Sequence, residues 1–149
     1  MSSKLKVYPH SDRDAYDVIS KLPKPLNTIL VEQKSGEYKD FHIASDDPDP
    51  MKGVTYSTNY GFLPGYTGED GHELDFFVGT QPDSGNVGYL LMHRPDIGEE
   101  VQEHKFYLAM TDKELESTLE SFAQVSRGQV AYKDVSELLL EIEKFKHQS

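Results

Sequence analysis

Apolar residues recur every three or four positions in three stretches of the chain, a spacing that predicts helices. The predicted helices cover residues 11–22, 111–125 and 134–145. Each starts near a residue whose side chain caps helices well: Ser11 or Asp12, Thr111, and Asp134. Thr111 is followed three residues later by Glu114, which completes the sequence pattern of a capping box.

Short apolar runs bounded by Gly, Pro, Asp and Ser lie between these helices and predict strands. The predicted strands are residues 27–33, 38–44, 74–80, 88–94 and 105–110, with a further short segment at 129–132. Residues 45–50, SDDPDP, are too rich in Pro and Asp for regular structure and predict a loop. Strands joined by turns favour a meandering antiparallel sheet over strands that alternate with helices. We therefore expect an α+β fold, a small antiparallel β-barrel with helices packed around it.

Length and composition narrow the classes of function. A chain of 149 residues is typical of one domain, expected here over residues 1–149. Its 26 acidic and 15 basic residues give a formal charge of −11, which repels nucleic-acid phosphates and suits a site that gathers divalent cations, or simply a solvated acidic surface. The absence of cysteine excludes disulfides and thiolate metal sites. Because no apolar stretch has the length of a leader or a membrane span, we expect a soluble, cytoplasmic protein that binds neither nucleic acid nor membrane.

The stretch from residue 52 to 78 has the most unusual composition, with tyrosines and glycines followed by a carboxylate cluster. Four carboxylates fall within seven residues: Glu69, Asp70, Glu73 and Asp75. On a strand that starts near position 74, Glu73 and Asp75 share a face, and Asp70 lies on the turn before it. Hard cations such as Mg²⁺ bind through a few carboxylates, so the cluster indicates a metal site. The spacing also fits a solvated acidic hairpin turn, since it lacks the alternating ligands of a calcium loop.

Two other groups of polar residues are less informative by themselves. Glu99 and Glu103 precede Lys105 in what has the pattern of a charged loop before a strand. Tyr132 and Lys133 precede the last predicted helix, where a lysine usually lies on the surface. The sequence has no HxxxH, GxSxG, Walker or GxGxxG pattern, so these residues do not belong to a recognised zinc, serine-nucleophile or nucleotide-binding loop motif.

Two motifs in this region resemble those of a known family. Tyr56-Ser-Thr-Asn-Tyr60-Gly-Phe, followed by Asp70-Gly-His72-Glu-Leu-Asp75, is similar to the YPxNYGF…DGDPLD signature of soluble family I inorganic pyrophosphatases. Weaker matches extend over residues 32–133. The resemblance implies an OB-like, five-stranded β-barrel with flanking helices, and Mg²⁺-dependent hydrolysis of diphosphate to two phosphates. It also implies homo-oligomers, which are common among members of this family.

The resemblance assigns roles to individual residues. It implies metal ligands at Asp70, Asp75 and Glu103, with Glu99 and Glu32 near the family's other metal-binding carboxylates. It implies substrate-binding residues at Lys39, Tyr56, Lys105, Tyr132 and Lys133. It places Asp70, Tyr60 and His72 at catalytic positions. These residue types suit the reaction, because splitting a phosphoanhydride depends on neutralising charge more than on covalent catalysis.

The chain departs from the family pattern at several positions. His72 stands where the family has the aspartate that helps deprotonate the attacking water, and a neutral imidazole also accepts a proton near pH 7. Phe41 and Pro48 fall where the family has a glutamate and a phosphate-binding arginine. Three functions therefore stay open: an inorganic pyrophosphatase, a metal-dependent hydrolase of another phosphoanhydride, and a catalytically impaired binding protein with this fold.

Overall fold

The computed structural model describes residues 7–41, 51–69, 71–83, 85–93 and 102–146. The predicted loop at 45–50 lies outside these residues, as do two predicted site residues, Asp70 and Glu99. The described helices are α1 (Arg13–Tyr16), α2 (Asp112–Ser121) and α3 (Val135–Ile142), with 3₁₀ turns η1 (Ile19–Lys21), η2 (Leu26–Thr28) and η3 (Glu143–Phe145). The described strands are β1 (Leu30–Gln33), β2 (Tyr38–Asp40), β3 (Gly53–Thr55), β4 (Asn59–Thr67), β5 (Glu73–Val78), β6 (Asn86–His93), β7 (Gln102–Met110) and β8 (Ser126–Ala131).

Six of the strands form one large sheet in the order β1-β4-β5-β7-β6-β8, and β2 pairs with β3 in a separate hairpin. The predicted α+β class is confirmed. The sheet has six strands where five were expected, and with β1 and β8 at its edges it agrees only loosely with a closed barrel. One pairing also differs from the expected antiparallel meander. Because β7 lies between β5 and β6, it runs parallel to β5.

The helix predictions hold best where capping chemistry supports them. Thr111 and Glu114 form the expected capping box at the start of α2, and the Asp134 side chain accepts hydrogen bonds from the backbone N–H groups of Ser136 and Glu137 at the start of α3. The helix predicted over residues 11–22 is instead the short helix α1, capped by Asp12, followed by the 3₁₀ turn η1. The predicted strand 27–33 begins later, because the residues before Ile29 form η2.

The strand β4 was not predicted, because its sequence NYGFLPGYT contains two glycines and a proline. Gly61 is required by close packing: a Cβ there would lie 1.9 Å from the carbonyl oxygen of Leu30 on β1. The register of β4 against β5 shifts between Leu63 and Thr67, where Pro64 is exposed and Gly65 has a φ of +88°. The bulge accommodates both residues without breaking the pairing that precedes it.

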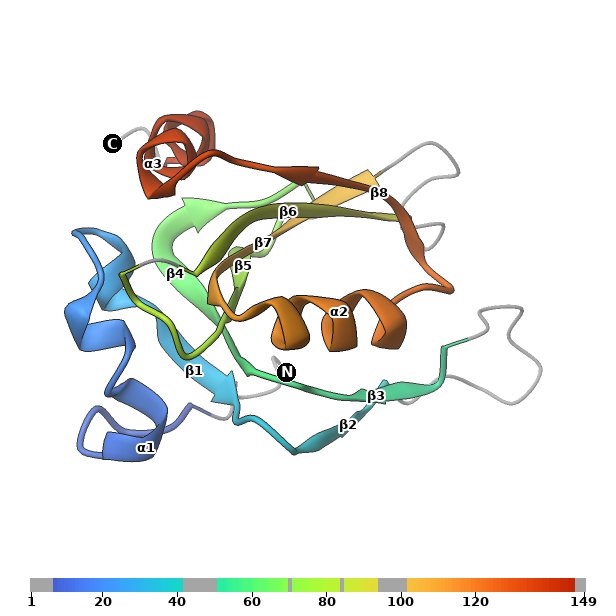
Figure 1. Ribbon diagram of the computed structural model, residues 1–149, viewed down its shortest axis with the longest axis horizontal. Helices are drawn as coiled ribbons and strands as arrows, with labels where there is room; N and C mark the ends of the chain where they lie inside the picture. The colour runs from blue at the N-terminus through green and yellow to red at the C-terminus, as the bar shows by residue number, and fades with distance from the viewer. Residues whose placement is uncertain (1–6, 42–50, 70, 84, 94–101, 147–149) are drawn as a thin grey trace.

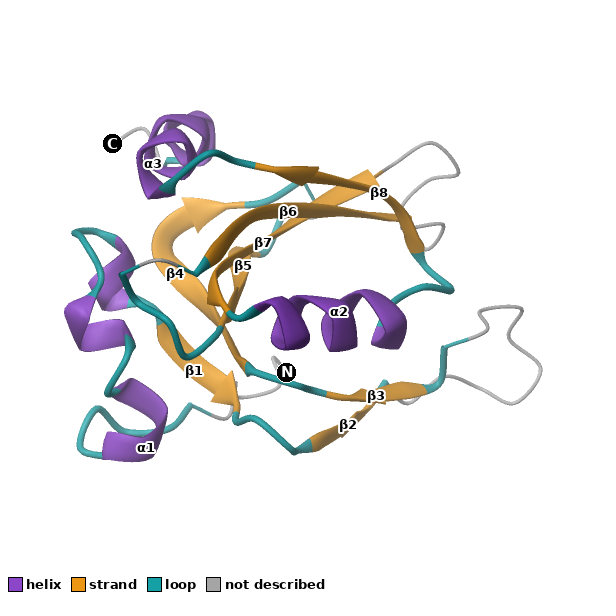
Figure 2. Cartoon of the chain, in the orientation of Figure 1, coloured by secondary structure: helices purple, strands orange, loops and turns teal. Residues whose placement is uncertain are grey.

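The large sheet has a hydrophobic cluster on each side. One face packs against α1, η1 and α3, with Phe76, Phe106 and Leu138 at the centre of its cluster; we call this the α3 face. The other face packs against α2 and the β2–β3 hairpin, with Phe77 and Tyr107 in its cluster; we call this the α2 face. Figure 1 shows α2 and α3 on opposite sides of the sheet, and Figure 2 shows how strands make up most of the molecule between them. No helix in the described part of the chain is long and apolar enough to span a membrane.

Candidate active site

A half-buried lysine on β7 organises a polar cluster on the α2 face. The Lys105 ammonium donates hydrogen bonds to Asp75 Oδ2 on β5, at 2.8 Å, and to the Tyr60 hydroxyl on β4, at 2.6 Å. It also forms an ion pair with Glu103 Oε1 at 3.6 Å. Its Nζ lies 5.2 Å from the centroid of the Tyr60 ring, within the range of a cation–π contact.

Strand alternation explains why these side chains meet. Successive residues of a strand point to opposite faces, so Glu103 and Lys105 share the α2 face of β7 with the buried Tyr107. Asp75 shares the same face of β5 with the buried Phe77, which is paired in register with Tyr60 of β4. The three strands are neighbours in the order β4-β5-β7, so their polar side chains converge at one place.

The charge of the cluster is unbalanced toward carboxylate. Glu32 on β1 joins Asp75 and Glu103, and it is 9% exposed. Burial raises the pKa of the Glu32 carboxyl, as does repulsion from Asp75, while Lys39 and Lys105 act in the opposite sense. Burial by itself would lower the pKa of the Lys105 ammonium, but the Asp75 and Glu103 carboxylates outweigh it and raise that pKa, so the lysine stays charged.

Two tyrosines form the wall beside Lys105. The rings of Tyr56 and Tyr60 stack with centroids 4.7 Å apart, and Phe77 and Phe122 pack behind them. Burial raises the pKa of both tyrosine hydroxyls, and nearby carboxylates contribute to both shifts. The two side chains are therefore neutral at physiological pH and act as hydrogen-bonding groups for oxygen atoms.

The β2–β3 hairpin brings a second lysine toward the cluster. Lys39 lies on β2 opposite Val54 of β3, and its positive charge acts on the Glu32 carboxylate. Phe41, at the position where the resembling family has a glutamate, is partly buried against the hydrophobic cluster of the α2 face. The wall next to Lys39 is therefore apolar where the family pattern would make it acidic.

The donor chemistry of this cluster fits Mg²⁺. Among the described residues, no three histidine or acidic side chains are already arranged around a common point as metal ligands. The Lys105 ammonium pairs with both the Asp75 and the Glu103 carboxylate, so these two side chains already balance a positive charge. With Glu32 the set contains three carboxylates against one central ammonium, and all the ligand atoms are oxygens, as Mg²⁺ requires.

Three other predicted residues are His72, Tyr132 and Lys133. His72 is exposed in the connection between β4 and β5, where its carbonyl accepts a hydrogen bond from the Gly68 N–H at 2.8 Å. Tyr132 packs on the α3 face, with its ring centroid 5.9 Å from that of Tyr89. Lys133 is exposed, and its backbone N–H donates to Glu137 Oε1 at 2.6 Å. The structure thus groups Glu32, Tyr56, Tyr60, Asp75, Glu103 and Lys105, with Lys39 nearby, but it does not bring Tyr132 to them.

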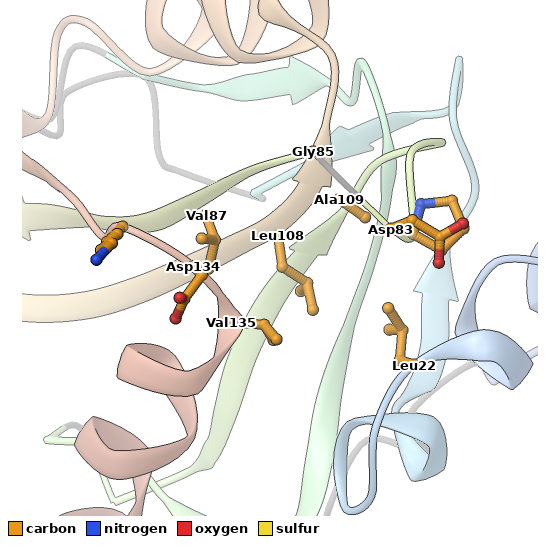
Figure 3. A pocket seen from close by; sticks show the side chains of 10 residues that line it. Leu22, Asp83, Gly85, Val87, Leu108, Ala109, Asp134 and Val135 are labelled. Carbon is orange, nitrogen blue, oxygen red and sulfur yellow. The ribbon is translucent and has the colours of Figure 1, made fainter.

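A cavity of about 260 Å³ lies away from this cluster, beside the N-terminus of α3. Its lining is mixed: Leu22, Val87 and Leu108 contribute apolar side chains and Asp83 and Asp134 contribute carboxylates, as Figure 3 shows. Lys133 lines it, but no other residue predicted for the site does. The candidate site is therefore the Lys105 cluster and not the cavity.

One pair of polar residues near the cluster was missed by sequence reasoning. The Glu69 carboxylate contacts Nδ1 of His104 and also accepts a hydrogen bond from the His104 backbone N–H at 3.2 Å. The partners are 35 residues apart, so no local spacing connects them. The available signal was the alternation along β7, which places His104 on the opposite face from Glu103 and Lys105.

Comparison with known proteins gives one match. The family model described as Inorganic Pyrophosphatase matches residues 12–147, which is most of the chain. Neither the curated proteins nor the solved structures gave a significant match. The matched range includes all of the residues that meet around Lys105 on the α2 face. The chain belongs to the inorganic pyrophosphatase family.

Proposed function

We propose that this protein hydrolyses inorganic diphosphate to two phosphates in a Mg²⁺-dependent reaction. The observation that carries the proposal is the contact of Lys105 with Asp75, Glu103 and Tyr60 on one face of the sheet. The arrangement combines carboxylates that hold a cation with an ammonium and hydroxyl groups that bind phosphate oxygens. The family match supports the same class of substrate.

Each part of the cluster has a role in this proposal. Asp75, Glu103 and Glu32 hold Mg²⁺, and Asp70 and Glu99, which lie outside the described residues, stay predicted ligands. Bound Mg²⁺ neutralises charge on the diphosphate oxygens and makes water more acidic. Without the cation, the carboxylates would repel diphosphate, so the acidic site and its anionic substrate are compatible only when metal is present.

The cationic and hydroxyl groups bind the substrate. Lys105 and Lys39 bind phosphate oxygens, and the neutral hydroxyls of Tyr56 and Tyr60 donate hydrogen bonds to them. With Mg²⁺ bound, the Asp75 carboxylate would hold the cation, and Lys105, which donates a hydrogen bond to Asp75 in this structure, would be available to substrate. These groups stabilise the charge that grows on the leaving phosphate.

A base is needed to take the proton of the attacking water. We propose His72 for this role, because it occupies the position of the family's central aspartate and an imidazole accepts a proton near pH 7. The roles of Tyr132 and Lys133 as phosphate ligands stay predictions. So do the cytoplasmic location and a homo-oligomeric state.

The deciding experiment measures phosphate release from diphosphate with and without millimolar Mg²⁺. Asp75→Asn removes the charge of a proposed ligand and is expected to lower the rate at least 100-fold. Asp83→Asn makes the same chemical change at an exposed residue beside the distant cavity and is expected to leave the rate unchanged. Equal rates for the two variants would refute the proposed site.

The apolar packing of Phe41 favours a second candidate, a metal-dependent hydrolase of an organic phosphoanhydride. Phe41 replaces an acidic position with a surface suited to an apolar group of the substrate. Phosphate release from a nucleoside diphosphate or triphosphate, but not from diphosphate, would support this candidate. If neither compound is hydrolysed although both metal and diphosphate bind, the protein is a catalytically impaired binding protein. A rate increase in His72→Asp would then trace the impairment to the base.

A further inference from the structure

The Glu69–His104 pair joins two segments that lead into the candidate site. Glu69 belongs to the connection between β4 and β5, a few residues before Asp75. His104 lies on β7 between Glu103 and Lys105. The Glu69 carboxylate contacts both the side chain and the backbone N–H of His104, so it fixes the position of the strand as well as that of the ring.

The His104 ring is held by aromatic packing on the α3 face. Its centroid lies 4.5 Å from that of Tyr89, 5.9 Å from Phe106 and 5.7 Å from Phe145. The side chains of His104 and Glu69 are only 22% and 29% exposed. A ring packed on three sides by aromatic groups has little freedom to turn, so the Glu69 contact constrains the loop to the strand.

The location of this contact matters because β5 and β7 pair only beyond the site. Their parallel register runs from Phe76 opposite Phe106 to Val78 opposite Leu108. Asp75 and Lys105 lie just before this register begins. In the described part of the chain, Lys105 contacts Asp75 on the α2 face, and Glu69, in the segment before β5, contacts His104 on the other side.

We propose that Glu69 and His104 are positioning residues that keep Asp75 and Glu103 aligned while substrate is bound. The inference rests on the proposed function, in which Lys105 releases Asp75 as it binds phosphate. At that moment the ion pair on the α2 face is lost, and the Glu69–His104 contact still ties the segment before β5 to β7, while β4 and β6 hold the outer sides of the two strands. The two carboxylates then stay at the separation that suits one cation.

The test compares Glu69→Ala with wild type in three measurements: thermal unfolding without Mg²⁺, Mg²⁺ affinity by calorimetry, and the steady-state constants kcat and KM. Without Mg²⁺ the Lys105–Asp75 ion pair is intact, so Glu69→Ala is expected to unfold close to wild type. Its Mg²⁺ affinity should fall about 10- to 100-fold, the range found when a group that supports metal ligands is removed. KM for diphosphate should rise by a similar factor, with a smaller change in kcat.

Two further variants separate positioning from a general packing defect. His104→Asn keeps an N–H donor near the place of Nδ1 and should retain most of the Mg²⁺ affinity, whereas His104→Ala should lose it like Glu69→Ala. Glu116→Ala removes an exposed glutamate from α2 and should match wild type throughout. If Glu69→Ala does not fold, Glu69→Gln, which keeps one acceptor oxygen for the backbone N–H, replaces it in the comparison.

The outcomes distinguish this inference from the proposed function. Unchanged Mg²⁺ affinity and KM in the folded Glu69 variant would overturn the positioning role, and so would His104→Asn behaving like His104→Ala. A wild type that binds Mg²⁺ but releases no phosphate would overturn the proposed function alone, because the affinity comparison would still decide the role of the pair. A wild type that binds no Mg²⁺ would overturn both.

Discussion

The two faces of the large sheet use the same strands for different purposes. On the α3 face, β5 and β7 contribute Phe76 and Phe106, whose rings stack with centroids 5.5 Å apart within the hydrophobic cluster of that face. On the α2 face, the neighbouring positions are Asp75 and Lys105, which are also largely withdrawn from water. Adjacent positions on each of these two strands therefore make a hydrophobic contact on one face and a charged contact on the other.

The apolar and the charged side chains of these strands contribute differently to stability. Burying a large aromatic side chain is favourable, whereas burying a carboxylate or an ammonium costs several kcal/mol that a partner offsets only in part. The hydrophobic clusters of both faces thus stabilise a sheet whose α2 face also holds a charged cluster. Changes to the apolar side chains of the α3 face should act mainly on stability, and changes to the charged cluster should depend on which cation is present.

Phe106→Ala should cause the largest loss of stability. The Phe106 side chain is fully buried between Phe76 and Phe145, and its removal leaves a cavity in the α3 cluster. The free energy of unfolding should fall by about 4 kcal/mol, as measured by urea denaturation. Added Mg²⁺ should not reduce this difference, because the lost contacts belong to the α3 cluster; a Mg²⁺-dependent recovery would mean that the loss reaches the metal site through His104, which packs on Phe106.

Lys105→Met should lower the free energy of unfolding by about 3 kcal/mol, somewhat less than Phe106→Ala. The cause is that the buried carboxylates lose their central ammonium. Here Mg²⁺ should restore much of the loss, since a cation then balances Asp75, Glu103 and Glu32. The matched control is Lys21→Met, which breaks an exposed ion pair with Asp17 and should change stability by less than about 0.5 kcal/mol. If Mg²⁺ stabilises both variants equally, the cation does not bind at the Lys105 cluster.

Tyr132→Phe tests whether Tyr132 only packs on the α3 face or also acts in the site on the α2 face. The Tyr132 hydroxyl is buried on the α3 face and has no hydrogen-bond partner among the described residues. Removing it should raise the free energy of unfolding by about 1 kcal/mol, because an unsatisfied buried polar group is lost. The geometry predicts unchanged kcat and KM. A rise in KM would instead support the phosphate-binding role implied by the family resemblance, and would require the ring to turn toward the α2 face.

Sequence reasoning predicted those parts of the molecule that depend on local signals. Short sequence patterns specify the capping box at Thr111, the cap at Asp134 and the strands β5, β6 and β7. The strand β4 was not predicted, because its glycines and proline allow close packing and a bulge. These features depend on the neighbouring strands and not on the local sequence. The order of the strands in the sheet was not predicted for the same reason, because no local pattern specifies that β7 lies between β5 and β6.

The candidate site divides in a similar way. Tyr56, Tyr60 and Asp75, which the structure brings together, were singled out because they lie within two neighbouring motifs, and the family resemblance added Lys105 from a distant strand. The position of Tyr132 on the α3 face was not foreseen, because a resemblance aligns residues but does not orient their side chains. The contact between Glu69 and His104 was not foreseen either, since it exists only once the β4–β5 connection meets β7.

The smallest expected effect concerns an ion pair at the surface, which serves as a counterpart to the buried pair of Lys105 and Asp75. The Asp12 carboxylate caps α1 and lies 3.3 Å from the Lys34 ammonium. The hydrogen bond from the Ala15 backbone N–H holds the pKa of Asp12 below its ordinary value of 3.8, and Lys34 lowers that pKa further. A lowered folded-state pKa means that the charged form stabilises the fold above pH 3.8, and that this contribution is lost as the pH falls through the folded value.

Asp12→Asn isolates this contribution, because asparagine keeps the capping oxygen but carries no charge. Urea midpoints should show wild type more stable than the variant at about pH 6, with the difference fading at about pH 2, where the aspartate is protonated. Lys34→Met should reproduce part of the loss at the higher pH and should be insensitive to Mg²⁺. If the difference between wild type and Asp12→Asn did not change with pH, the effect would come from the geometry of the cap and not from its charge. The surface pair would then make no electrostatic contribution to stability, unlike the buried pair of Lys105 and Asp75.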